Sequence, residues 1–124
     1  MNIFGIGNDT VEPERMAEKC KRPGFLDRVF SETEIAYCIS KKHSSEHFAA
    51  RFAAKEAYMK AMGSGWSEGA DFKEIEVIND DNGAPKIYLH GKTREKFDDL
   101  NLKSIFVSLS HTSANAIAFI IITQ

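Results

Sequence analysis

A carboxylate and several cations fall together on one helix-forming stretch of the chain. Residues 51–63 are rich in Ala, Lys, Glu, Arg and Met, and Gly63 stands where a helix end favours a left-handed residue. At about 100° per residue, Glu56 lies in the apolar stripe of this helix, beside Phe52 and Met59. Because an unpaired buried charge costs several kcal/mol, Glu56 requires a partner or a cation to bind.

Two interpretations of Glu56 follow from the residues alone. It could form an ion pair with Lys60 one turn later, in the favourable order for such a pair. It could instead hold a metal ion beside an anionic ligand, since Arg51, Lys55 and Lys60 add three cations to the same few turns. The inward position of Glu56 favours the metal interpretation.

A second acid and a histidine are further candidates. Asp9 is expected at the end of a strand over residues 2–8, in which Gly5 and Gly7 would let another backbone or a ligand come close. Ligands often lie at such strand ends. His111, with Thr112 beside it, is either an ordinary residue of a hairpin loop or a donor that faces a phosphate.

Periodicity and turn signals predict the elements that position these residues. Helices are expected over about 13–21, 32–39, 46–62 and 92–100, and strands over 2–8, 75–78, 86–90, 105–110 and 116–122. Ser31 and Glu34 have the spacing of a capping box. The run 116–122 is almost wholly apolar, so we expect a central strand covered on both faces and antiparallel to 105–110. The predicted fold class is α+β, with an antiparallel sheet packed on a long central helix and shorter helices.

Length and composition restrict the class of protein. With 124 residues and 43% hydrophobic content, the chain suits a single domain over residues 1–124. A net charge of −2 argues against a nucleic-acid-binding protein. No run approaches the roughly 20 apolar residues of a membrane span, and no signal segment is evident, so we expect a cytoplasmic protein. Cys20 and Cys38 are expected to be free thiols that pack as small apolar side chains.

Charge is distributed unevenly along the chain. Residues 15–28 carry two acids and five cations, which are Arg15, Lys19, Lys21, Arg22 and Arg28. Residues 68–81 carry six acids and one cation, Lys73. This asymmetry could steer an acidic partner onto the amino-terminal half. Charge alone favours the simpler interpretation, in which these residues form solvated helix faces.

Three separated stretches and one turn carry a resemblance to a known family. They are Gly5-Ile6-Gly7-Asn8-Asp9, Arg51-Phe52-Ala53-Ala54-Lys55-Glu56 with Lys60 and Gly63, Ser108-Leu109-Ser110-His111-Thr112, and the turn Asn82-Gly83-Ala84-Pro85. Their order and spacing resemble the bacterial holo-acyl-carrier-protein synthases, the short single-domain branch of the 4′-phosphopantetheinyl transferases, over nearly the whole chain. Val11 stands where two-repeat relatives have a second acid, which favours the trimeric branch.

The resemblance implies an activity: transfer of the phosphopantetheine arm of coenzyme A to a serine of apo acyl carrier protein, which releases adenosine 3′,5′-bisphosphate. It implies that Asp9 and Glu56 bind Mg²⁺, and that Lys60 clamps a phosphate or accepts the serine proton. The implied coenzyme A contacts are Arg51, Lys55, Ser64, Pro85, His111 and Thr112, and the implied carrier-protein contacts are Arg15, Lys19, Lys21, Arg22 and Arg28.

The family further implies a homotrimer whose active sites are shared between subunits. Pro13 is less usual in the first helix of the family and bears on how Arg15 is presented. Two other classes of function suit the same residues. One is a coenzyme A or nucleotide-binding module without turnover, and the other is a metal-dependent phosphohydrolase.

Overall fold

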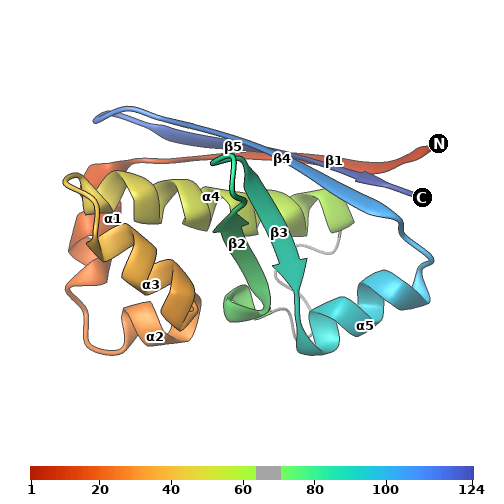
Figure 1. The fold of residues 1–124 in the computed structure, drawn as a ribbon, viewed down its shortest axis with the longest axis horizontal. Helices are drawn as coiled ribbons and strands as arrows, with labels where there is room; N and C mark the ends of the chain where they lie inside the picture. Colours follow the sequence, from red (N-terminus) through yellow and green to blue (C-terminus); the bar gives the residue numbers. More distant parts are fainter. Residues whose placement is uncertain (64–70) are drawn as a thin grey trace.

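The fold is built on one long helix beneath a three-stranded sheet (Figure 1). The computed structural model describes residues 1–63 and 71–124. Its helices are α1 (Pro13–Cys20), α2 (Phe25–Val29), α3 (Glu32–Ile39), α4 (Ser44–Met62) and α5 (Gly91–Asp99), with a short 3₁₀ turn, η1 (Phe72–Glu74). Its strands are β1 (Ile3–Val11), β2 (Ile75–Asn79), β3 (Pro85–Leu89), β4 (Ser104–His111) and β5 (Ala116–Thr123).

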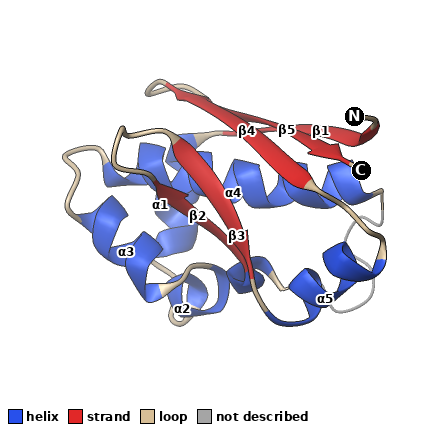
Figure 2. Cartoon of the chain, turned by 45° about the vertical axis from the view of Figure 1, so that its right-hand side comes forward, coloured by secondary structure: helices blue, strands red, loops and turns tan. Residues whose placement is uncertain are grey.

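Two antiparallel sheets pack around α4. The larger has the strand order β1-β5-β4, and the smaller is the β2-β3 hairpin. Figure 2 shows the larger sheet along one side of α4, with α1, α2 and α3 grouped near one end of the molecule and α5 near the other. The predicted α+β class is therefore confirmed. In the described part of the chain, no helix is long and apolar enough to cross a membrane.

Small residues let β1 lie directly on α4. A side chain on Gly7 would collide with the backbone carbonyl of Ala57, and one on Gly5 would collide with that of Ala61. The buried alanines of α4 have short side chains, so the sheet can pack close to the helix backbone. The close backbone approach expected at these two glycines is thus observed, and it carries Asp9 to the second half of α4.

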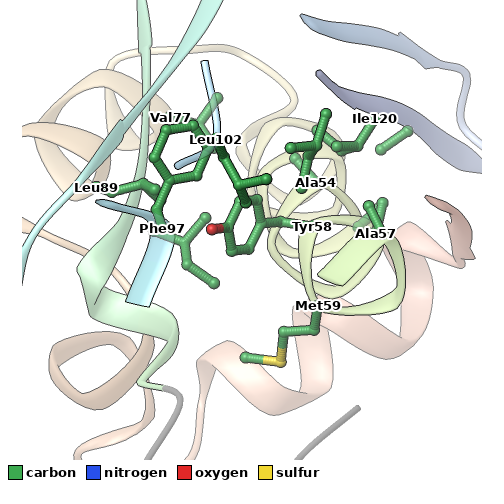
Figure 3. Close-up of a cluster of buried hydrophobic side chains, with 14 residues drawn as sticks. Ala54, Ala57, Tyr58, Met59, Val77, Leu89, Phe97, Leu102 and Ile120 are labelled. Atoms are coloured by element: carbon green, nitrogen blue, oxygen red, sulfur yellow. The ribbon is translucent and has the colours of Figure 1, made fainter. Parts of the chain in front are cut away.

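Two apolar clusters bury α4 on several sides. In the cluster shown in Figure 3, Tyr58 projects from α4 toward Phe97 and Leu102. The other cluster joins the first half of α4 to the amino-terminal helices through Met16 and Phe30, among others. Because both clusters contain residues of α4, this helix joins the two parts of the core.

Three sequence predictions need correction. The helix α2 was not expected, because five residues are too few to show a helical period. The strand β1 continues to Val11, so Asp9 lies within it, paired with Ala118, rather than at its end. Similarly, β4 includes His111, which the sequence assigned to a loop. For β1 and β4, pairing with β5 extends the strand beyond its apolar residues.

The central strand β5 is covered on only one face in a single chain. Its inner residues are buried, but Phe119 is 51% exposed and Ile121 is 37% exposed. The register places Ile121 between Ile6 of β1 and Phe106 of β4, which are also exposed. The prediction that β5 is central and antiparallel to β4 is confirmed, and the prediction that it is covered on both faces is wrong for the single chain. A row of apolar side chains thus crosses the outer face of the sheet.

Candidate active site

Asp9, Glu56 and Lys60 come together where β1 crosses α4. The ammonium nitrogen of Lys60 lies 2.9 Å from Oδ1 of Asp9, and the Asp9 side chain is 15% exposed. Lys60 therefore pairs with Asp9 on the neighbouring strand rather than with Glu56 one turn earlier. The simple helical ion pair considered for Glu56 is not what the fold forms.

Burial and a second carboxyl group hold Glu56 in an unusual protonation state. Burial raises the pKa of Glu56 to about 7, and a hydrogen bond with Asp9 and the charge of Asp9 act in the same direction. Lys19 and Lys60 oppose this rise in the pKa. Two carboxyl groups that share a proton in this way form a place where a cation could replace the proton.

The donor set fits a hard divalent cation. Mg²⁺ typically takes one or two carboxylates and completes its coordination with water and substrate phosphate. In the described part of the chain, no group of three or more acidic, histidine or cysteine side chains could hold a metal ion. Asp9 and Glu56 would thus hold Mg²⁺ as a pair of carboxylates, with its remaining positions open to a phosphate.

A cleft of about 180 Å³ opens beside Glu56, between α1 and α4. Arg15 and Lys19 line this cleft, so two of the predicted carrier-protein contacts lie next to the carboxylate pair. The remaining three, Lys21, Arg22 and Arg28, are exposed on the same helical end of the molecule. Arg15 and Lys21 each form an exposed ion pair with an acid three residues earlier in the chain. This surface is basic and accessible.

A second cleft lies elsewhere on α4 and contains three predicted coenzyme A contacts. Arg51, Pro85 and His111 line a cavity of about 240 Å³. Arg51, Tyr37, Asn79 and Gly83 also line an adjoining cavity of about 400 Å³. We call these two cavities together the arginine cleft. It is bounded by α3, α4, the β2-β3 turn and β4.

Arg51 is prepared to bind an anion in the arginine cleft. It is only 3% exposed, its guanidinium carbon lies 4.2 Å from the centre of the Tyr37 ring, and Nη2 donates to Oδ1 of Asn79 at 3.2 Å. Among the described residues, Nε has no hydrogen-bond partner and no carboxylate forms an ion pair with the guanidinium. A buried guanidinium without a paired carboxylate favours an anionic ligand such as phosphate.

His111 lines the same cleft, next to Glu46 and His47, which the sequence did not predict as its neighbours. Its Nδ1 lies 2.9 Å from Oε1 of Glu46, and its ring centre lies 4.7 Å from that of His47. Thr112 follows in the turn, where its hydroxyl accepts from the backbone of Ala114 and Asn115. The spacing of His47 and Arg51, four residues apart on one helix, was the available signal that His47 shares this face.

Lys55, a predicted coenzyme A contact, does not line the arginine cleft. Lys55 is completely buried, and its ammonium nitrogen is bonded to Oε1 of Glu34 at 2.9 Å and to the carbonyls of Phe72 at 2.9 Å and Ile75 at 2.6 Å. With its hydrogen-bonding capacity used inside the protein, it does not serve as a surface phosphate contact. Ser64 lies outside the described residues.

The predicted site residues of one chain therefore occupy two separate places. Arg51 and Glu56 are five residues apart, which is about 140° around a helix. The cleft beside Glu56 and the arginine cleft share no lining residue. In a single chain, the carboxylate pair and the arginine cleft are therefore separate binding places.

Comparisons with known proteins identify the family. A sequence model described as the 4′-phosphopantetheinyl transferase superfamily matches residues 5–119. The chain is 43% identical to the holo-[acyl-carrier-protein] synthase of Geobacter sp. (strain M21), with 98% of this chain and 99% of that protein covered. It is 42% identical to the synthase of the same name from Koribacter versatilis, with 97% and 98% covered.

Solved structures agree with these sequence matches. The fold superimposes on the holo-[acyl-carrier-protein] synthase of Neisseria meningitidis with a TM-score of 0.89 at 26% identity, covering 98% of this chain and 99% of that one. For the Helicobacter pylori synthase in complex with coenzyme A, the TM-score is 0.83 at 35% identity, covering 95% and 99%. The chain belongs to the 4′-phosphopantetheinyl transferase superfamily.

Proposed function

We propose that this chain is a holo-acyl-carrier-protein synthase. It transfers the 4′-phosphopantetheine moiety of coenzyme A to a serine of apo acyl carrier protein and releases adenosine 3′,5′-bisphosphate. The proximity of Asp9, Glu56 and Lys60 beside a basic cleft is the observation that carries this proposal. The relatives named holo-[acyl-carrier-protein] synthase support it. We assign the reaction to the cytoplasm, because the free thiols of Cys20 and Cys38 suit a reducing compartment.

The residues at the crossing of β1 and α4 suit phosphoryl transfer. In the reaction the serine oxygen bonds to the phosphorus that carries pantetheine, the bond from that phosphorus to the bridging oxygen breaks, adenosine 3′,5′-bisphosphate leaves with that oxygen, and the hydroxyl proton passes to water. When bound by Asp9 and Glu56, Mg²⁺ would supply charge neutralisation at the pyrophosphate. Lys60 is assigned as a phosphate clamp rather than a base, because its ammonium already forms an ion pair with Asp9.

The arginine cleft is assigned to coenzyme A, with Arg51 and His111 binding phosphate, Pro85 lining the cavity and Thr112 beside it. A crystal structure of the Helicobacter pylori synthase with coenzyme A supports this class of ligand. Since the arginine cleft and the Asp9–Glu56 pair are separate in one chain, we propose that each active site combines the arginine cleft of one subunit with the carboxylates of another. The apolar row on the outer face of the sheet supplies the interface of a homotrimer.

The first prediction concerns the transfer itself. Incubation of the protein with coenzyme A, Mg²⁺ and apo acyl carrier protein should add one phosphopantetheine mass to the carrier. Glu56→Gln should slow this transfer by about 10²–10³-fold, because the charge that holds the cation is lost, and high Mg²⁺ should restore part of the rate.

Glu95→Gln, on the exposed surface of α5, is the matched control and should transfer at the normal rate. A protein that binds coenzyme A without adding mass to the carrier would be a binding module, and release of product without carrier would indicate a phosphohydrolase. Near-normal turnover in Glu56→Gln would refute the metal assignment.

The second prediction concerns the trimer. Phe119→Lys places a charge on the outer face of the sheet, two residues from Ile121 and next to the apolar row, so it should convert the trimer to monomers and abolish transfer together. Light scattering on a sizing column measures the first effect. Tyr88→Lys changes another half-exposed aromatic residue, on β3 outside this sheet, and should leave the trimer intact. A wild-type preparation that is fully active and wholly monomeric would be incompatible with the proposal.

The third prediction concerns the carrier protein. The basic residues of the amino-terminal helices are proposed to receive an acidic surface of the carrier. Reversing the charge of Arg15 and Arg22 should raise KM for the carrier by about tenfold and weaken its salt dependence, with KM for coenzyme A little changed. Lys92→Glu combined with Lys96→Glu makes the same charge change on α5 and should have little effect. The assignment fails if coenzyme A binding is lost and carrier binding survives.

A further inference from the structure

His47 lies inside the arginine cleft, although neither the motifs nor the mechanism above uses it. It stands one helical turn before Arg51 on α4 and lines the same cavity of about 240 Å³. Its ring is edge-on to two others, with centre-to-centre distances of 5.8 Å to Tyr37 and 4.7 Å to His111. Two imidazoles and a buried guanidinium therefore converge on one cavity.

The hydrogen bond between Glu46 and His111 decides what the His111 ring can offer a ligand. A carboxylate oxygen can only accept a hydrogen bond. Nδ1 of His111 therefore carries a proton and donates to Oε1 of Glu46. In the neutral ring, Nε2 then holds a lone pair, which cannot bond the oxygens of a phosphate dianion. Phosphate can bind Nε2 only after His111 gains a second proton.

The surroundings of His47 disfavour its protonated form when no anion is bound. Burial, together with the nearby His111, Arg51 and Lys41, lowers the pKa of His47 from its ordinary value, and the charge of Glu46 opposes this. Tyr37 faces the ring from α3, and Asp80 and Asp81 line the adjoining cavity. A phosphate dianion in the cleft would reverse the excess of positive charge around His47.

We propose that His47 is a second phosphate-binding histidine of the arginine cleft, and that it takes up a proton when the cleft binds the phosphate of adenosine 3′,5′-bisphosphate. The inference rests on the proposed function, since it assigns a further binding residue to the coenzyme A site. His47 and His111 act together with Arg51, which lines the same cavity.

Calorimetry in two buffers of different ionisation enthalpy measures the protons taken up on binding adenosine 3′,5′-bisphosphate. Wild-type protein should take up more protons than a variant that lacks an ionisable side chain at position 47, and its affinity should weaken more steeply as pH rises from about 6.5 to about 8.5. His47→Phe keeps an aromatic ring but cannot ionise, so it should take up fewer protons, by up to about one, and its affinity should fall about tenfold less over this pH range. His47→Gln should behave in the same way.

His43→Phe is the matched control, because His43 is exposed, precedes α4 and makes no capping hydrogen bond through its side chain. It should keep the wild-type proton uptake. Equal proton uptake in wild type and His47→Phe would overturn the inference and leave the transferase assignment standing. Failure of wild type to bind the bisphosphate at all would overturn both.

Discussion

The direct contact between the backbone of β1 and the surface of α4 is the constraint on which the structure depends. It exists because Gly5 and Gly7 have no side chain to strike the carbonyls of Ala61 and Ala57. Two residues beyond Gly7, Asp9 is thereby brought to Lys60 and Glu56. The rest of the sheet follows, since β5 pairs with β1 along its length and β4 pairs with β5. The same contact between β1 and α4 thus packs the sheet on the helix and assembles the candidate active site.

A buried ion pair plays the corresponding role for the arginine cleft. Glu34 bonds the Lys55 ammonium and the backbone N–H of Val77, and its capping-box bond to Ser31 begins α3. One carboxylate therefore holds α3, α4 and β2 at fixed positions around Arg51. Removing either member of such a pair would leave an uncompensated buried charge, which typically costs about 3–5 kcal/mol. The cleft is preorganised by groups that do not reach its surface.

The sequence predicted the elements with strong local patterns and missed what tertiary contacts decide. The capping box of α3, the left-handed end of α4 at Gly63 and the pairing of β4 with β5 follow from local residue types. The position of Lys55 does not, because a lysine in a basic segment gives no local sign that Glu34 will meet it. Likewise, the apolar run of β5 indicates burial on both faces, whereas the fold of one chain covers only one. The helical spacing of Arg51 and Glu56 already places them on different faces of α4. Only the structure shows that these faces line separate clefts.

The account as a whole requires that Asp9 and Glu56 form one coupled cation site. Carbon-13 NMR of the Glu56 carboxyl, assigned by its loss in Glu56→Gln, tests this without any turnover. The metal-free protein should show Glu56 titrating near pH 7, and Mg²⁺ should move that titration to lower pH, because a bound cation favours the charged carboxylate. A Glu56 that titrates at its ordinary value of 4.5, or one whose raised titration does not respond to Mg²⁺, would contradict the account.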